Sequence, residues 1–204
     1  MQQTCRHPLE EFLTTPAARH DFYHVPLQTM DQSLTTLLMR TNRQNKVLLA
    51  HIKDQLSFDS LFELLYHHER ALVLRAADAI EKVTAKHQEF LHTHKLDLLR
   101  LFTTSDHPEL KWHLAQLIAR VTLLQDEAEE VWKILQYWTR NPNESKLVRV
   151  HALQSLYDLS RIYPEFREPF QEILTVVAHE PIPSLQARIR KLRNNLDKQA
   201  VLPG

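Results

Sequence analysis

The chain has almost no glycine. Its 204 residues include one, Gly204 at the last position, against ten prolines. Tight β-hairpins and phosphate-binding loops rely on glycine, because only glycine enters the left-handed backbone region without steric cost. A chain without internal glycine can build few of these structures. Because Leu, Ala, Gln, Glu, Lys and Arg dominate the rest of the composition, we predict an all-α fold of helices packed on helices.

Charge and cysteine usage narrow the class of protein further. The chain carries 25 basic and 25 acidic residues, so its formal net charge is zero, and its single cysteine is Cys5. A general nucleic-acid-binding protein usually has a basic excess, and a disulfide framework needs paired cysteines. The longest apolar runs are far shorter than the roughly 20 residues that cross a bilayer. We therefore expect a cytoplasmic protein with no membrane partner.

An internal repeat of 38 residues predicts how the helices are arranged. Four apolar residues recur at the same helical spacing in three successive copies. The copies are Leu72, Ala76, Ile80 and Val83; Leu110, Leu114, Ile118 and Val121; and Val148, Ala152, Leu156 and Leu159. A fourth copy reads Leu185, Ile189, Arg193 and Leu196, with a cation in the third position. A repeat of this length is typical of a helical solenoid, whose terminal repeats often degenerate because one face meets water.

Each repeating helix follows another helix with an apolar face. These preceding helices are predicted at 58–67, 90–103, 128–139 and 166–179. The segments between helices contain Pro, Asn, Asp and Ser, which stop one helix and cap the next. Two earlier apolar segments lie at 34–38 and 47–56. Residues 1–30 have three prolines and weak periodicity, so we expect an irregular or short-helix lead-in there, followed by a single helical-repeat domain over 31–204 that is clearest over 58–197.

The repeating helices also share a short sequence pattern. They begin Leu72-Val73-x-x-Ala76-Ala77, Leu110-Lys111-x-x-Leu114-Ala115 and Val148-Arg149-x-x-Ala152-Leu153. This pattern resembles the second helix of HEAT repeats, in which Val-Arg precedes an Ala-rich apolar stripe. The resemblance implies a right-handed α-solenoid of antiparallel helix pairs. It also implies a ladder between repeats, in which a basic residue pairs with a turn acid; Lys111 and Arg149 match the basic position and Val73 does not.

The resemblance implies a function as well. HEAT-like stacks hold partners on the concave surface lined by their second helices, so we expect a non-catalytic binding module or scaffold that docks a protein or peptide segment. The 38-residue spacing identifies the polar side chains that would form rows on this surface. Those expected to bind the partner are Arg75, His113, His151, Gln116, Gln154 and Arg120. The solvated face of any amphipathic helix would present similar rows.

A second hypothesis is nucleic-acid binding near the C-terminus. From residue 181 to residue 204, five basic residues accompany a single acidic one. The candidate basic patch consists of Arg188, Arg190, Lys191 and Arg193. Cations clustered on one helix can contact phosphates. The alternative interpretation is a solvated last helix whose cations complement the negative end of its own dipole.

An enzymatic function finds little support in the sequence. HEAT-like alkylpurine DNA glycosylases hold a Trp and an Asp close together in their groove. Here Trp112 is followed one helical turn later by Gln116, and its neutral amide cannot supply that carboxylate. No nucleophile elbow or phosphate loop occurs. We predict no catalytic residue and favour a protein that is not an enzyme.

The 13 histidines raise the question of a metal site. His20 and His24 are one helical turn apart with Asp21 between them, and zinc accepts such a pair together with a carboxylate. However, the sequence fixes no third ligand, and it lacks the His-Glu-x-x-His pattern of zinc enzymes. We therefore predict neither a metal ion nor another cofactor.

Overall fold

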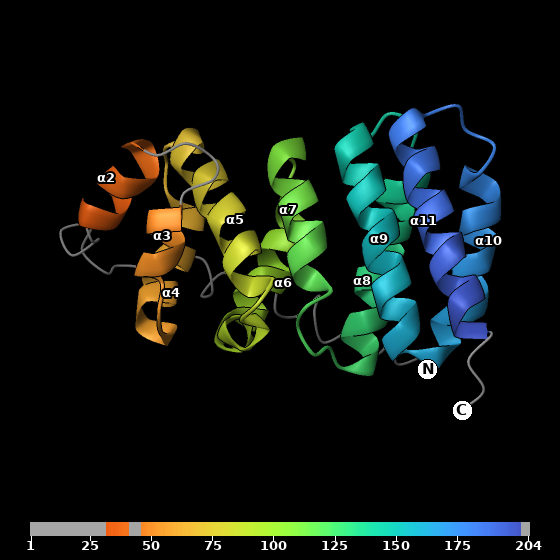
Figure 1. The fold of residues 1–204 in the computed structure, drawn as a ribbon, viewed down its shortest axis with the longest axis horizontal. Coiled ribbons are helices and arrows are strands. Elements are labelled where there is room, and N and C mark those ends of the chain that lie inside the picture. The colour runs from red at the N-terminus through yellow and green to blue at the C-terminus, as the bar shows by residue number, and fades with distance from the viewer. Residues whose placement is uncertain (1–31, 41–45, 201–204) are drawn as a thin grey trace, which may run out of the picture.

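The fold is a stack of α-helices (Figure 1). The computed structural model describes residues 32–40 and 46–200; the predicted lead-in at 1–30 and the His20 and His24 pair lie outside the described residues. The helices are α2 (Gln32–Arg40), α3 (Lys46–His51), α4 (Gln55–Glu63), α5 (Arg70–Thr84), α6 (Lys95–Thr104), α7 (Pro108–Ile118), α8 (Gln125–Arg140), α9 (Lys146–Ile162), α10 (Arg167–Val177) and α11 (Pro183–Ala200). Short 3₁₀ turns follow α4 and precede α6 and α10. The described residues contain no strand, so the all-α prediction is confirmed.

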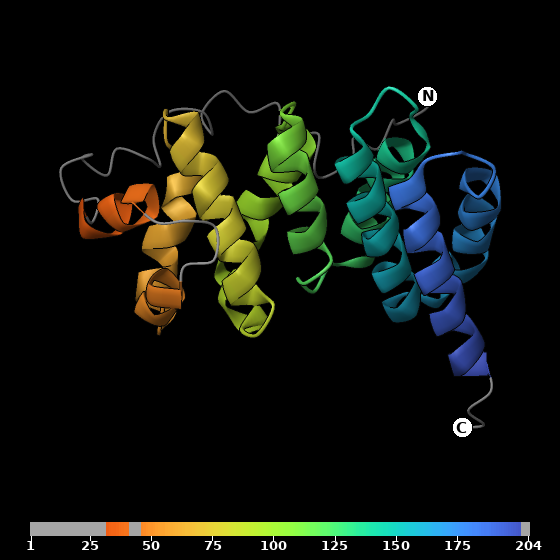
Figure 2. The same ribbon diagram turned by 45° about the horizontal axis from the view of Figure 1, so that its top comes forward.

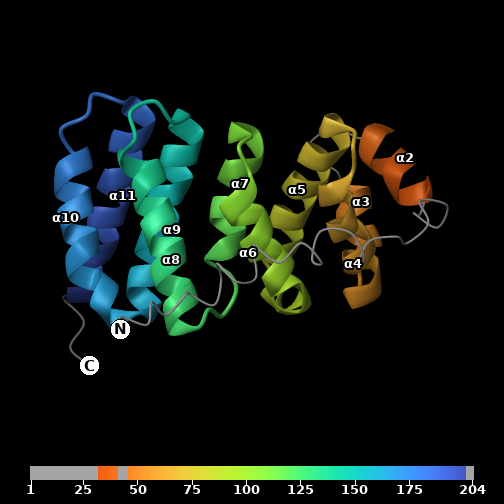
Figure 3. The ribbon, with the colours of Figure 1, turned by 180° about the vertical axis from the view of Figure 1, so that it is seen from behind.

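From α4 onward the helices form two layers (Figures 1 and 3). One layer contains α4, α6, α8 and α10, and the other contains α5, α7, α9 and α11. The pairs α4 with α5, α6 with α7 and α8 with α9 pack together, and α9 also contacts α7, α10 and α11. At the N-terminal end of the stack, α2 and α3 pack against α5 (Figure 2). The outer surface of α5, α7, α9 and α11, which carries Asp78, Gln116 and Gln154, is called the second-helix face below.

The apolar stripe predicted from the repeat is buried along the whole stack. None of its twelve residues in the three clear copies exposes more than 7 % of its surface. Alanines at 76, 77, 115 and 152 are fully buried beside the larger side chains. Between α7 and α9 the Ser155 hydroxyl donates a hydrogen bond to the Ala115 carbonyl across 2.5 Å. Small residues on both helices therefore bring α7 and α9 close together.

The fourth copy uses a different register from the predicted one. Its third buried residue is Leu192, whereas Arg193 is exposed. The buried side chains Leu185, Ile189 and Leu192, together with the half-buried Leu196, keep the spacing of an amphipathic helix and bury no cation. The prediction that a cation replaces an apolar residue in this copy is therefore wrong, because the apolar position has moved by one residue.

One helix boundary also differs from the prediction. The apolar spacing over 47–56 indicates one segment, but α3 ends at His51 and α4 begins at Gln55. The Asp54 carboxylate accepts a hydrogen bond from the Ser57 backbone N–H at 2.9 Å, and the Ser57 hydroxyl accepts one from the Asp54 N–H at 3.2 Å. This reciprocal capping box fixes the start of α4. As a result Leu56 is 76 % exposed and does not belong to the core.

The helices end without left-handed caps. No non-glycine residue in the described part of the chain has a positive φ. The residues that follow α6, α8 and α9 are Ser105, Asn141 and Tyr163, and all three have negative φ and extended ψ. A left-handed cap is the helix ending that most often requires glycine. The extended endings explain how the chain turns between helices without it.

Ion pairs connect each of two second helices to the turn of the next repeat. Lys111 Nζ lies 3.1 Å from Glu144 Oε2, and Arg149 Nη2 lies 2.5 Å from Glu180 Oε1. The Arg149 side chain is almost completely buried, with 1 % exposure, and its Nε donates to the Thr139 carbonyl at 2.9 Å. Lys111 and Arg149 are the two basic ladder positions implied by the HEAT resemblance, and both make the expected contact.

Replacement of Arg149 by Met should lower the free energy of unfolding by about 2–4 kcal/mol, because the Thr139 carbonyl and the Glu180 carboxylate both lose their partner. Urea denaturation followed by far-UV circular dichroism measures the change. Arg167→Met is the matched control, since it removes an exposed cation from α10, and it should change the free energy by less than about 0.5 kcal/mol. Equal effects of the two substitutions would contradict a structural role for Arg149.

Candidate functional site

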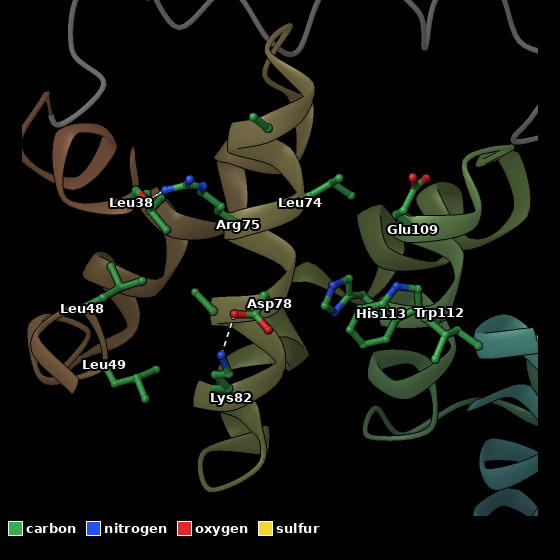
Figure 4. Close-up of a pocket in the computed structure, with 13 residues that line it drawn as sticks. Leu38, Leu48, Leu49, Leu74, Arg75, Asp78, Lys82, Glu109, Trp112 and His113 are labelled. Atoms are coloured by element: carbon green, nitrogen blue, oxygen red, sulfur yellow. Dashed lines mark hydrogen bonds and ion pairs between the residues drawn. The ribbon is translucent and has the colours of Figure 1, made fainter. Parts of the chain in front are cut away.

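A pocket of about 530 Å³ opens in the N-terminal half of the second-helix face (Figure 4). Helices α2 and α3 form one side, α7 forms the other, and α5 runs between them. The large apolar residues of its lining are Leu38, Leu48, Leu49, Leu74, Trp112 and Leu147. Leu147, at the start of α9, is 55 % exposed although it is a large apolar residue. The pocket therefore presents apolar surface to solvent.

The charged side chains of the pocket already have partners within the protein. Asp78 and Lys82 form an ion pair of 2.6 Å on α5 (Figure 4). Glu109 pairs with Arg70, which lies outside the pocket. Arg75, a predicted partner-binding residue, donates through Nη1 to the Leu38 and Met39 carbonyls at 2.6 and 2.7 Å. These bonds satisfy carbonyls in the last turn of α2, so Arg75 joins α2 to α5.

The middle of the second-helix face is built around aromatic rings on α7 and α9. The Trp112 ring lies 3.5 Å from the ring of His113 and 5.2 Å from that of His151. His113 is 3 % exposed, so it does not lie in an open row, but it lines the pocket beside Trp112 (Figure 4). His151 and Trp112 are both half-buried. The Gln116 amide donates to the Trp112 carbonyl at 3.3 Å, which holds this predicted site residue against its own helix.

Arg120, another predicted site residue, lies just after α7 and connects this turn to the end of α5. Its Nη1 donates to the Glu81 carbonyl at 2.6 Å and to the Thr84 hydroxyl at 2.7 Å, and its Nη2 lies 2.7 Å from Glu81 Oε1. The guanidinium thus bonds the last turn of α5 and a carboxylate in that turn. Arg120 bonds to three acceptor atoms on two residues of the stack, so its first role is structural.

At the C-terminal end of the face, α9 and α11 share a polar cluster. Arg188 Nη1 donates to Gln154 Oε1 at 2.6 Å, and Gln154 Nε2 donates to Asp158 Oδ1 at 2.9 Å. Burial raises the pKa of the Asp158 carboxyl, and hydrogen bonding by Gln154 opposes the shift. Burial, followed by the nearby Arg188 cation, lowers the pKa of His151 to about 4, with Glu81 acting in the opposite direction. His151 is therefore a neutral imidazole at pH 7.

The comparisons with known proteins agree with this architecture. Residues 30–199 match the HEAT repeat domain family. The chain belongs to the HEAT repeat family. A solved structure of an engineered protein is similar to this chain, with a TM-score of 0.51 at 15% identity, over 80% of this chain and 47% of that one. This chain therefore spans about half the length of that protein, and the likeness concerns the fold alone. No curated protein matches the sequence.

The four cations proposed for nucleic-acid binding do not form one patch on the HEAT repeat domain. Arg190, Lys191 and Arg193 are exposed on α11, but Arg188 is half-buried and bonds to Gln154 on α9. Sequence counting groups the four together because it ignores which side of the helix each one occupies. Arg188 therefore belongs to the second-helix face.

Sequence reasoning missed the apolar side of the pocket. Leu38, Leu48 and Leu49 come from α2 and α3, which precede the clear repeats, so no 38-residue partner marked them. Leu147 falls in the row of Ala71 and Glu109, whose three members differ in chemistry. A large apolar residue next to a predicted helix start was the one signal available. Such a residue is equally common in a core, so the signal did not distinguish the two cases.

In the described part of the chain, no group of three or more His, Cys, Asp or Glu side chains is arranged to hold a metal ion. No helix in it combines the length and the apolar character needed to cross a membrane.

The low pKa of His151 makes stability depend on pH. Below pH 6.5 the unfolded chain binds a proton at this residue, whereas the folded protein does not until about pH 4, so the free energy of unfolding falls as the pH drops through this window. Because the ring is partly exposed, the loss at pH 5 should be about 1 kcal/mol. Urea denaturation of the wild type and of His151→Gln, each at pH 7.5 and at pH 5, isolates the contribution of His151 to this loss of stability. An identical pH dependence of the two proteins would contradict the assignment.

Proposed function

We propose that this HEAT repeat domain is a non-catalytic scaffold that binds an apolar segment of a protein partner on its second-helix face. HEAT repeat domains typically act as protein-interaction scaffolds. The observation that carries the proposal is the pocket, whose lining combines the half-buried Trp112 with the exposed Leu147. Exposed apolar surface within a recess costs free energy in water, and a partner side chain that covers it recovers that free energy.

The charges around the pocket favour an apolar segment over a charged one. The ion pairs of Asp78 with Lys82 and of Glu109 with Arg70 neutralise the carboxylates of the rim, so a charged ligand would have to compete for groups that are already paired. An apolar side chain meets no such competition. Burial of one Leu-sized side chain contributes about 1.5–3 kcal/mol, so two or three anchors overcome the cost of ordering a short peptide.

The size of the face sets the length of the segment. Helix axes pack about 8–10 Å apart, so the four steps from α2 through α5, α7 and α9 to α11 span roughly 36 Å. An extended chain advances about 3.3 Å per residue, and about 11 residues would cover this distance. A peptide of that length could contact the pocket and the α9–α11 cluster together.

The proposal is tested by using the full chain to select binders from a displayed library of random peptides of about 16 residues. We expect to select peptides that carry two or three large apolar residues and whose binding depends on the pocket. Leu147→Gln should weaken them about tenfold, because it removes one apolar wall of the pocket. Fluorescence polarisation with synthetic peptides measures the dissociation constant.

Ile162→Gln is the matched control for that experiment. Ile162 is on the same helix, α9, and its exposed fraction of 59 % is similar to the 55 % of Leu147. It does not line the pocket. Its replacement should leave peptide affinity unchanged within about twofold. Failure to select any peptide, or equal effects of the two substitutions, would refute the proposed function.

A further inference from the structure

Arg188 differs from the other half-buried cations of the second-helix face. Lys82 and Arg120 are paired with Asp78 and Glu81, and each of these pairs lies within 3 Å. Arg188 donates to the neutral amide of Gln154, and among the described residues no carboxylate forms an ion pair with it. A guanidinium offers five N–H donors in a fixed fork that matches a carboxylate. The side chain is therefore ordered on the face without the acidic partner that its geometry fits.

The nearest acid does not fill this position. Asp158 interacts electrostatically with Arg188, but its Oδ1 accepts a hydrogen bond from Gln154 Nε2 and it forms no ion pair with the guanidinium. Gln154 thus separates the two charges, giving one end of its amide to each. Arg188 is half-buried, so the cation has lost part of its hydration, and this burial lowers its pKa. A partly dehydrated cation gains more from an added anion than an exposed one does.

The surroundings of Arg188 carry an excess of positive charge. Arg161 on α9 and Lys191 on α11 are exposed, and Asp158 is the acid that interacts with Arg188 in this cluster. His151 adds no charge at neutral pH. Around the pocket, by contrast, the acids Asp78 and Glu109 are paired with cations. The second-helix face therefore has an apolar end, where the carboxylates are paired, and a cationic end.

The two ends are parts of one continuous surface. Trp112 lines the pocket, and its ring lies 5.2 Å from that of His151. His151 is one helical turn before Gln154, which holds Arg188. From α7 to α11 there are two helix-packing steps, or roughly 18 Å, which an extended peptide covers in about five or six residues.

We propose that the partner segment carries an Asp or Glu whose carboxylate binds the Arg188 guanidinium, about five or six residues from the apolar side chain that enters the pocket beside Trp112. This inference rests on the proposed function and specifies the chemistry of its partner. The pocket supplies apolar burial, and Arg188 supplies selection for an acid at a set distance. Arg188 keeps its bond to Gln154 through Nη1 and offers its remaining N–H groups to the carboxylate.

The peptide selection described above provides the probe. Peptides selected by the wild type should be enriched in Asp or Glu at that distance from an apolar residue. For the tightest peptide, Glu→Gln or Asp→Asn should weaken binding to the wild type about tenfold or more. Arg188→Gln should cause the same loss, and the amide peptide should bind Arg188→Gln no more weakly than the acidic one does. This pattern identifies a direct contact, because the second change costs nothing once the first is made.

Two further variants separate the contact from a general effect. Arg190→Gln is the matched control, since it removes an exposed cation from the same helix, and it should change the affinity less than about twofold. Arg188→Glu should restore binding to a peptide that carries Lys in place of the acid. The urea denaturation midpoint of each variant shows whether it is folded, and Arg188→Lys offers a conservative replacement that keeps the charge without the fork.

The outcomes distinguish this inference from the proposed function. Peptides that depend on Leu147 but show no acidic preference, and bind Arg188→Gln as well as the wild type, would overturn the role of Arg188 and leave the scaffold function intact. A library that yields no Leu147-dependent peptide would overturn both. A single-stranded DNA of about 12 nucleotides, added as competitor, should not displace the peptide at 150 mM salt; displacement that requires Arg188 would reassign the site to nucleic acid.

Discussion

Burial of the second-helix stripe is the constraint on which the rest of this structure depends. In each of the three clear copies of the 38-residue repeat, four apolar residues on α5, on α7 and the turn after it, and on α9 face inward and lie almost completely out of water. With that side of the helix fixed, the opposite side must form the outer face of the stack. Helix α9 illustrates the consequence, because it packs against α7, α8, α10 and α11 and still presents His151 and Gln154 to the surface. The positions of the pocket and of Arg188 both follow from this arrangement.

The rows of polar side chains on the second-helix face also connect neighbouring repeats, which the 38-residue period alone does not reveal. Residues 38 positions apart become neighbours in a solenoid, so a row of long polar side chains can bond to the preceding repeat as easily as to a partner. Arg75 reaches back to the end of α2, Arg120 to the end of α5, and Arg188 to Gln154 on α9. In the first two cases the acceptors are carbonyls in the last turn of a helix, and the Glu81 carbonyl accepts from the Ala85 N–H as well. These arginines therefore add side-chain donors to helix ends that no glycine caps.

The features that could be predicted from the sequence are those formed by residues that recur in each repeat. The stripe, the two helix layers and the ladder contacts of Lys111 and Arg149 all follow from residues that recur, so independent copies support one another. The pocket does not recur, because α2 and α3 pack against one side of α5 at one end of the stack and contribute Leu38 and Leu48 there. The register of α11 was missed for a related reason: a single degenerate copy cannot show whether Leu192 or Arg193 is the buried residue. His113 is buried and its ring contacts that of Trp112, which the spacing of the repeat does not report.

Whether a cation of the second-helix face has a carboxylate partner says more about its availability to a ligand than its exposure does. Lys82 and Arg120 lie on the second-helix face but are neutralised inside the stack, whereas Arg188 is held by an amide and keeps its full charge. The separation between Arg188 and the pocket is set by the packing of α7, α9 and α11. That packing is fixed by buried side chains, among them Ala115, Leu156 and Ile189. The residues that end α6, α8 and α9 are extended, and no described residue has a positive φ, so these turns do not use the conformational freedom of glycine. The packed core fixes the distance between the apolar end and the cationic end. Such a surface selects a ligand by the spacing of the ligand's residues as well as by their chemistry.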